Sequence, residues 1–112
     1  MKSQKFKEIL KEIEKYPAYH LEAFHSNGGD NNKDKKYIVW QETGWKAYYG
    51  SDGRKAVVVF IQVELYTEDD FDPLLDELIA LLEKHNISFL EPVTTFDIST
   101  KKILHIIECE VI

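Results

Sequence analysis

The chain has 112 residues, of which 44% are hydrophobic and 30% charged, and its net charge is −6. This length and composition predict one folded domain over residues 1–112 rather than a disordered protein. The acidic balance argues against binding to a nucleic-acid backbone or to an anionic membrane. The lone cysteine, Cys109, cannot form an internal disulfide, and no segment resembles a signal peptide or a membrane span. We therefore expect a cytosolic protein.

The first predicted element is a short amphipathic helix. Lysine and glutamate separate apolar residues that recur with the spacing of one helix face. Pro17 predicts the end of this helix, because proline lacks a backbone donor and clashes with the preceding turn. Residues 19–24 could then form a short strand. The apolar face consists of Phe6, Ile9, Leu10 and Ile13.

Residues 26–36 differ in composition from the rest of the chain. They include no apolar residue, two adjacent glycines and many Asn, Asp and Lys residues. Such a segment cannot offset the entropy cost of ordering, so we expect a long mobile loop. Loops of this length inside a domain are either functional or disordered.

A hairpin is predicted in the middle of the chain. Residues 37–41 are a strand candidate, Thr43 and Gly44 suggest a bend, and residues 45–49 continue towards an Asp52-Gly53 turn signal. In residues 56–66, every second side chain from Val57 to Leu65 is apolar, and the segment is rich in β-branched residues. This pattern predicts the strongest strand of the chain.

A second helix and a closing hairpin complete the predicted elements. Asp72 is the expected N-cap, Pro73 the first helical residue, and Asn86 the left-handed residue that ends the helix. Residues 87–97 and 102–112 are predicted as two strands around the polar turn 98–101. The order α-β-β-β-α-β-β predicts an α+β fold. It would consist of an antiparallel sheet, with a mixed sheet as the alternative, and two helices on one face.

We find no convergent set of residues that would support catalysis. His20 and His25 lie five residues apart near a strand, which excludes joint ligation of a metal there, and His105 and Cys109 alternate with apolar residues of a strand. The acidic residues of segment 68–72 suit the start of a helix and lack EF-hand spacing. We therefore expect no catalytic, cofactor or metal site.

The central strand predicts a contact with a partner. Its residues 57–61 are apolar on both faces, whereas two helices can cover only one face of a sheet. Partner contact is our favoured interpretation, and burial by the first helix and the loops is the alternative.

The sequence resembles the tail terminator, or tail-completion, proteins of long-tailed bacteriophages and prophages, which are also described as minor tail or head–tail joining proteins. The resemblance is a pattern of residue types over most of the chain after Tyr37. It rests on Tyr37-Ile38-Val39-Trp40, on Ile61-Gln62-Val63-Glu64-Leu65-Tyr66-Thr67, on the leucine-rich helix and Asn86-Ile87-Ser88-Phe89, and on the closing hairpin from Phe96-Asp97 to Ile112.

This resemblance implies a virion assembly protein rather than an enzyme. Members form a ring, commonly hexameric, that binds the end of the tail tube, stops its polymerisation and meets the head connector. The resemblance thus implies self-association, the tail-tube protein and the connector as partners, and the virion or the host cytoplasm as the location. DNA would pass through an acidic lumen without specific binding.

Two segments are the expected contact elements, namely the loop 26–36 and the hairpin 44–54. A bacterial acidic binding module, such as an immunity protein or antitoxin that caps a basic toxin, is the alternative function, and a small enzyme is a third. The residues we expect at a partner contact are Asn27, Asp30, Asn31, Lys33, Trp45, Tyr48, Tyr49 and Arg54.

Overall fold

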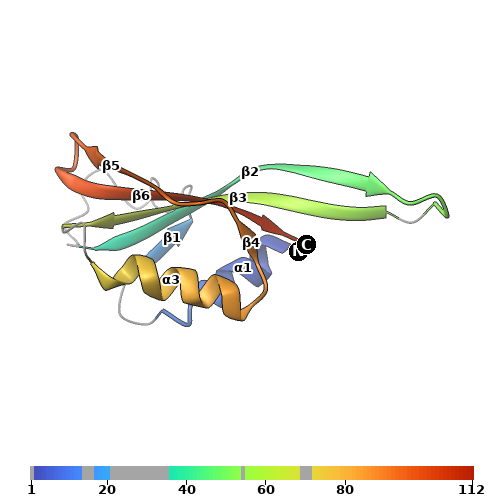
Figure 1. Cartoon of the computed structure of the whole chain (residues 1–112), viewed down its shortest axis with the longest axis horizontal. Helices are drawn as coiled ribbons and strands as arrows, with labels where there is room; N and C mark the ends of the chain where they lie inside the picture. Colours follow the sequence, from blue (N-terminus) through green and yellow to red (C-terminus); the bar gives the residue numbers. More distant parts are fainter. Residues whose placement is uncertain (1, 14–16, 21–35, 54, 69–71) are drawn as a thin grey trace.

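The computed structural model describes residues 2–13, 17–20, 36–53, 55–68 and 72–112. Helix α1 (Lys2–Leu10) is followed by strands β1 (Ala18–His20), β2 (Tyr37–Tyr49) and β3 (Lys55–Thr67). Helix α3 (Pro73–Lys84) then leads to strands β4 (Ser88–Phe89), β5 (Val93–Asp97) and β6 (Lys102–Val111). The labels are those of Figure 1.

These strands form a six-stranded sheet in the order β1-β2-β3-β6-β4, with β5 also paired to β6. All pairs are antiparallel except β1 with β2, which is parallel. Both helices lie against the same face of the sheet (Figure 1). The α+β prediction is confirmed, and the mixed sheet offered as the alternative is the one observed.

The hydrophobic core fills the space between the helices and one face of the sheet. Ile61, Val63 and Leu65 of β3 point into it, as the alternation of the sequence predicts. The predicted stripe of α1 is buried there at Phe6 and Leu10. Further members of this core are Ile38, Trp40, Leu74, Leu78, Leu82, Ile107, Cys109 and Val111.

Local signals place the ends of α3 correctly. Asp72 is the N-cap, and its Oδ1 accepts a hydrogen bond of 2.9 Å from the backbone N–H of Leu74. Lys36, at the start of β2, forms an ion pair with Asp72. Beyond the helix, Asn86 adopts a left-handed φ of 56°, as predicted.

The prediction of one continuous strand over residues 87–97 is wrong. The segment is divided into β4 and β5, which pair with opposite ends of β6. Residues 90–92 between them are not in a strand. The reason is Pro92, which has no N–H to donate to a strand ladder. The chain therefore has one more strand than the predicted order.

The structure also departs from a compact shape. Its radius of gyration is 15.0 Å and its extents are 51 × 29 × 25 Å, whereas a compact domain of this length has a radius of gyration of about 13 Å. Figure 1 shows the cause, because the paired ends of β2 and β3 project away from the helices.

Candidate protein-interaction site

A projecting ribbon is the most distinctive surface feature of the described chain. We define the arm as residues 44–49 of β2, residues 55–58 of β3 and the turn between them; the other described residues are the body. β2 and β3 pair without interruption from Gly44 and Phe60 to Tyr49 and Lys55. β6 extends only as far as Val59, so the arm has two strands where the body has a wider sheet.

The sequence explains why the arm forms. Its strands are rich in aromatic and β-branched residues, which favour paired, extended backbone. The predicted turn is confirmed, because the N–H of Gly53 donates a 3.0 Å hydrogen bond to the carbonyl of Gly50. Gly53 has a φ of +83°, a conformation that favours glycine.

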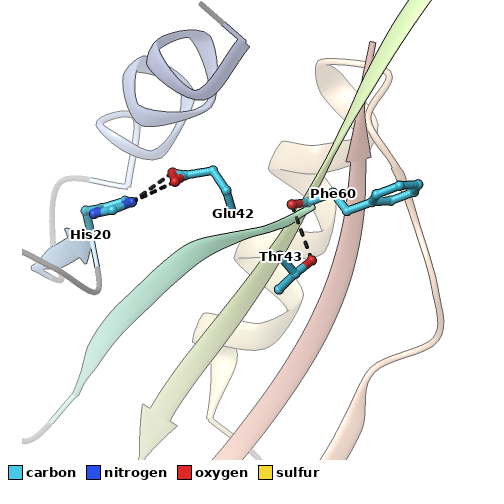
Figure 2. Close-up of polar contacts among 4 residues, drawn as sticks. All are labelled: His20, Glu42, Thr43 and Phe60. Atoms are coloured by element: carbon cyan, nitrogen blue, oxygen red, sulfur yellow. Dashed lines mark hydrogen bonds and ion pairs between the residues drawn. The ribbon is translucent and has the colours of Figure 1, made fainter. Parts of the chain in front are cut away.

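A β-bulge marks the base of the arm. The register between β2 and β3 shifts between Glu42 and Gly44, which leaves Thr43 as the extra residue. The hydroxyl of Thr43 donates to the carbonyl of Phe60 at 3.4 Å (Figure 2). The bend expected at Thr43 and Gly44 is therefore a bulge within a continuous strand, which bends and twists the strand without ending it.

The edge of the sheet beside the bulge is held by His20 and Glu42. Nε2 of His20 donates to the Glu42 carboxylate, with distances of 2.8 and 3.1 Å to its two oxygens (Figure 2). The His20 ring also meets the ring of Trp40 edge-on, with centroids 4.7 Å apart. These contacts hold the part of β2 that lies just before the arm, at Trp40 and Glu42.

Beyond the bulge, the helix side of the ribbon carries mostly apolar side chains, and its two aromatic ones are exposed. Trp45 is 67% exposed and Tyr49 is 72% exposed. The residues opposite Trp45 and Ala47 across the ribbon are Val59 and Val57, and both are half-buried. Val59, at the base of the ribbon, packs against the core, and the ribbon beyond it extends past the helices (Figure 1). We call this surface the Trp45 face.

The other side of the arm is also largely apolar. Tyr48 is 48% exposed there, and the Lys46 Nζ lies 5.0 Å from the centre of its ring. Such a cation–π contact is weak at an exposed site. Isolated two-stranded ribbons are at best marginally stable in water. An arm that is apolar on both sides is therefore suited to contact with another protein.

The arm also presents unpaired backbone along its edges. β1 pairs with β2 only as far as Trp40, so β2 from Gln41 to Tyr49 has a single neighbouring strand among the described residues. Open, apolar strand edges favour association with other chains unless a partner covers them.

Of the residues predicted at a partner contact, the structure brings together Trp45, Tyr48 and Tyr49, all exposed on the arm. The remaining five lie outside the described residues: Asn27, Asp30, Asn31, Lys33 and Arg54. The prediction of a mobile loop over 26–36 likewise falls outside them, apart from Lys36.

Two of the residues considered as catalytic candidates, His105 and Cys109, are buried. His105 is buried between two hydroxyls, with Nδ1 2.8 Å from Oγ1 of Thr94 and Nε2 3.5 Å from Oγ1 of Thr67. Burial raises the pKa of the Cys109 thiol to about 12, so the group stays protonated at neutral pH.

The described part of the chain lacks both a metal-binding cluster and a membrane-spanning helix. No group of three or more His, Cys, Asp or Glu side chains is placed to hold a metal ion. No helix there is long and apolar enough to cross a membrane.

The sequence did not reveal a groove on the sheet face away from the helices. It has a volume of about 450 Å³. The side chains of Phe60, Gln62, Glu108 and Glu110 form its floor, and Thr43 and Leu90 flank it. In the sequence, only the alternation of glutamate with apolar residues at the end of β6 hinted at this groove. The pairing of β6 with β3 is needed to place these glutamates beside Phe60.

Comparison with known proteins does not identify a family for this chain. No protein-family model matches the sequence, and no curated protein matches it at a significant level.

Proposed function

We propose that this protein is a virion assembly subunit of a long-tailed phage or prophage, a tail terminator or head–tail joining protein. It forms a ring on the tail tube and stops tube polymerisation. The single observation that carries the proposal is the arm, which exposes Trp45, Tyr48 and Tyr49 on a ribbon that the helices do not cover. Exposed apolar surfaces of this kind mark sites where another protein binds.

Two further properties support this function. The residues on which the family resemblance rests lie in the body, namely in β2 before the bulge, in β3 from Ile61, in α3 and in the segments after it. The net charge of −6 also suits a ring through which DNA slides, because like charges repel.

The proposed mechanism is steric and needs no bond chemistry. One face of the ring would reproduce the docking surface that a tube subunit offers to the last tube ring. The opposite face would deny that surface to the next tube subunit and would meet the head connector instead. Partner contacts made by the arm supply the affinity.

The test is a tube-growth assay. Tail-tube protein from the same phage or prophage is allowed to polymerise with increasing amounts of this protein, and tube lengths are measured by electron microscopy. We expect the wild-type protein to bind tube ends and stop growth. Tubes that grow to the same lengths with and without it would contradict the proposal.

A matched pair of variants tests the role of the arm. Trp45→Ser/Tyr49→Ser removes two exposed aromatic residues from the arm, and Phe96→Ser/Ile98→Ser removes two exposed apolar residues, 55% and 82% exposed, from the other end of the sheet. Only the arm variant should fail to stop tube growth.

The alternative function, an acidic binding module that caps a basic toxin, is favoured by one specific observation. Glu108 and Glu110 are exposed together on the floor of the groove. Under this alternative, reversing both charges would abolish binding of the toxin encoded by a neighbouring gene, and the protein would have no effect on tubes.

A further inference from the structure

The groove and the Trp45 face of the arm have complementary chemistry. The groove offers an apolar surface at Phe60 and Leu90 beside the carboxylates of Glu108 and Glu110. Neither carboxylate forms a hydrogen bond or ion pair with another described residue. An apolar, acidic groove suits an occupant with exposed aromatic rings and an unpaired cation.

The arm has this character, in contrast to the rest of the chain. Residues 44–58 include Lys46, Arg54 and Lys55 but only one acidic residue, Asp52, which gives the segment a charge of +2. Because the whole chain carries −6, the remainder carries −8.

Lys55 identifies the side of the arm that suits the groove. It lies opposite Tyr49 on the Trp45 face, is exposed and has no ion-pair partner among the described residues. Lys46 lies on the other side, where it already contacts Tyr48. The Trp45 face therefore combines the two most exposed aromatic residues of the arm with a free ammonium group.

A chain cannot place its own arm in its own groove. Thr43 and Phe60, at the base of the arm, line the groove, and the arm leads away from that point (Figure 1). The continuous pairing of β2 with β3 keeps the ribbon extended. The groove is thus open to the arm of another molecule.

We propose that the arm of one copy of this protein docks by its Trp45 face in the groove of a second copy. Trp45 and Tyr49 cover Phe60 and Leu90 of the neighbour, and Lys55 reaches the Glu108 and Glu110 carboxylates. The contact joins two different surfaces, so it repeats head-to-tail and closes into a ring when the rotation permits. The inference rests on the proposed ring-forming function and names the contact between its subunits.

Charge reversal with rescue tests the contact. Self-association is followed by light scattering during size-exclusion chromatography, over a range of concentrations. We expect the arm variant Lys55→Glu and the groove variant Glu108→Lys/Glu110→Lys each to weaken association by about tenfold or more. When the changes are combined in one chain, association should recover a large part of the loss. Every arm then carries a negative charge and every groove a positive one, so the two surfaces attract each other again.

Two control variants alter the charge by the same amounts elsewhere. Lys46→Glu changes the other side of the arm, and Glu77→Lys/Glu83→Lys changes two exposed residues of α3. We expect both controls to associate nearly as the wild type does, since none of Lys46, Glu77 and Glu83 lines the groove. Equal losses in the test and control variants would overturn the inference, and so would a wild-type protein that stays monomeric throughout.

Disulfide trapping gives an independent measurement of the same geometry. Tyr49→Cys and Glu110→Cys are introduced in separate chains, while the native Cys109 is 1% exposed and does not interfere. We expect a cross-linked dimer only when the two variants are mixed. Cross-linking of the Tyr49→Cys variant with itself would overturn the inference, because the arms would then pack against each other.

The outcomes separate this inference from the proposed function. Head-to-tail association with no effect on tail tubes would leave the arm-in-groove contact in place and contradict the tail terminator function. Rings that stop tube growth but tolerate both charge reversals would support that function and overturn the contact.

Discussion

The same two strands behave differently in the body and in the arm. In the body, Ile61, Val63 and Leu65 of β3 are almost fully buried beneath the helices. In the arm, Val57 continues the same face of β3 but is only half-buried, because the arm extends beyond the helices (Figure 1). The residue types hardly change along the strand, so the difference lies in what covers them. Apolar side chains stabilise the fold in one region and remain available for a partner in the other.

This contrast predicts the largest effect for a change in the body. Leu78 of α3 is fully buried in the core. Leu78→Ala should lower the free energy of unfolding by about 2–5 kcal/mol, because it removes buried methyl groups and leaves a cavity. Urea denaturation followed by circular dichroism measures the loss. A loss no larger than that caused by Trp45→Ala in the arm would erase the distinction between the two regions.

A smaller effect is expected where the sheet and α3 are joined at Asp72. Asp72→Ala removes the N-cap and the partner of Lys36, and should cost about 1–2 kcal/mol. Asp72→Asn is the matched variant, because asparagine keeps the cap but loses the charge. It should therefore cost less than the alanine variant in the same denaturation experiment.

The stability contributed by the charge of Asp72 depends on pH. Burial opposes ionisation, but the Lys36 ammonium and the Leu74 N–H outweigh it and hold the pKa of Asp72 below its ordinary value. The carboxylate therefore stabilises the fold above its unfolded pKa, and this contribution is lost as the pH falls through the folded pKa. Wild type and Asp72→Asn should converge in stability on acidification. A constant difference from neutral pH to strong acid would contradict this account.

The turn of the arm should respond more weakly still. Gly53→Ala places a side chain at a φ of +83° and should cost about 1 kcal/mol. Since the arm is separate from the core, we expect faster amide exchange in the arm and little change in the body. Gly44→Ala is the control, because its φ is not positive and its added carbon would meet only Phe60 Cδ2, at 3.9 Å. Faster exchange throughout the body of Gly53→Ala would show that the two regions unfold together.

The smallest effect on stability is expected on the Trp45 face. Trp45→Ser should change the free energy of unfolding by no more than about 0.5 kcal/mol, because Trp45 packs against little of the fold. The two tryptophans report on the two regions separately, since Trp40 is 4% exposed and Trp45 is 67% exposed. At concentrations low enough to keep the protein monomeric, acrylamide should quench the emission of the Trp40→Phe variant strongly and that of the Trp45→Phe variant weakly. Similar quenching of both in the monomer would contradict the exposure of Trp45.

The sequence was sufficient where the deciding interactions are local. The alternation of β3 and the capping residues of α3 depend on near neighbours, and both predictions are confirmed. The division between β4 and β5 also had a local signal in Pro92, which we did not weigh. The parallel pairing of β1 with β2 depends on residues far apart in the chain, and no local pattern specifies it.

The candidate site was predictable in part for the same reason. The exposed aromatics could be named as contact residues because they crowd a predicted hairpin. Their exposure could not be derived, since it depends on where β6 and the helices end relative to β3. The groove could not be predicted from the sequence, because its position depends on the register between β3 and β6.

The extra residue at Thr43 decides which side chains of the ribbon lie on the helix side. Because directly paired residues of neighbouring strands share a face, the bulge keeps Gly44 opposite Phe60 and Trp45 opposite Val59, with Trp45 on the helix side. A regular ladder that retained Thr43 would pair it with Phe60 and would turn Gly44, Lys46 and Tyr48 towards the helix side. Deletion of Thr43, in contrast, would leave both faces of the ribbon as they are, so a lineage could lose the bulge without exchanging the two surfaces.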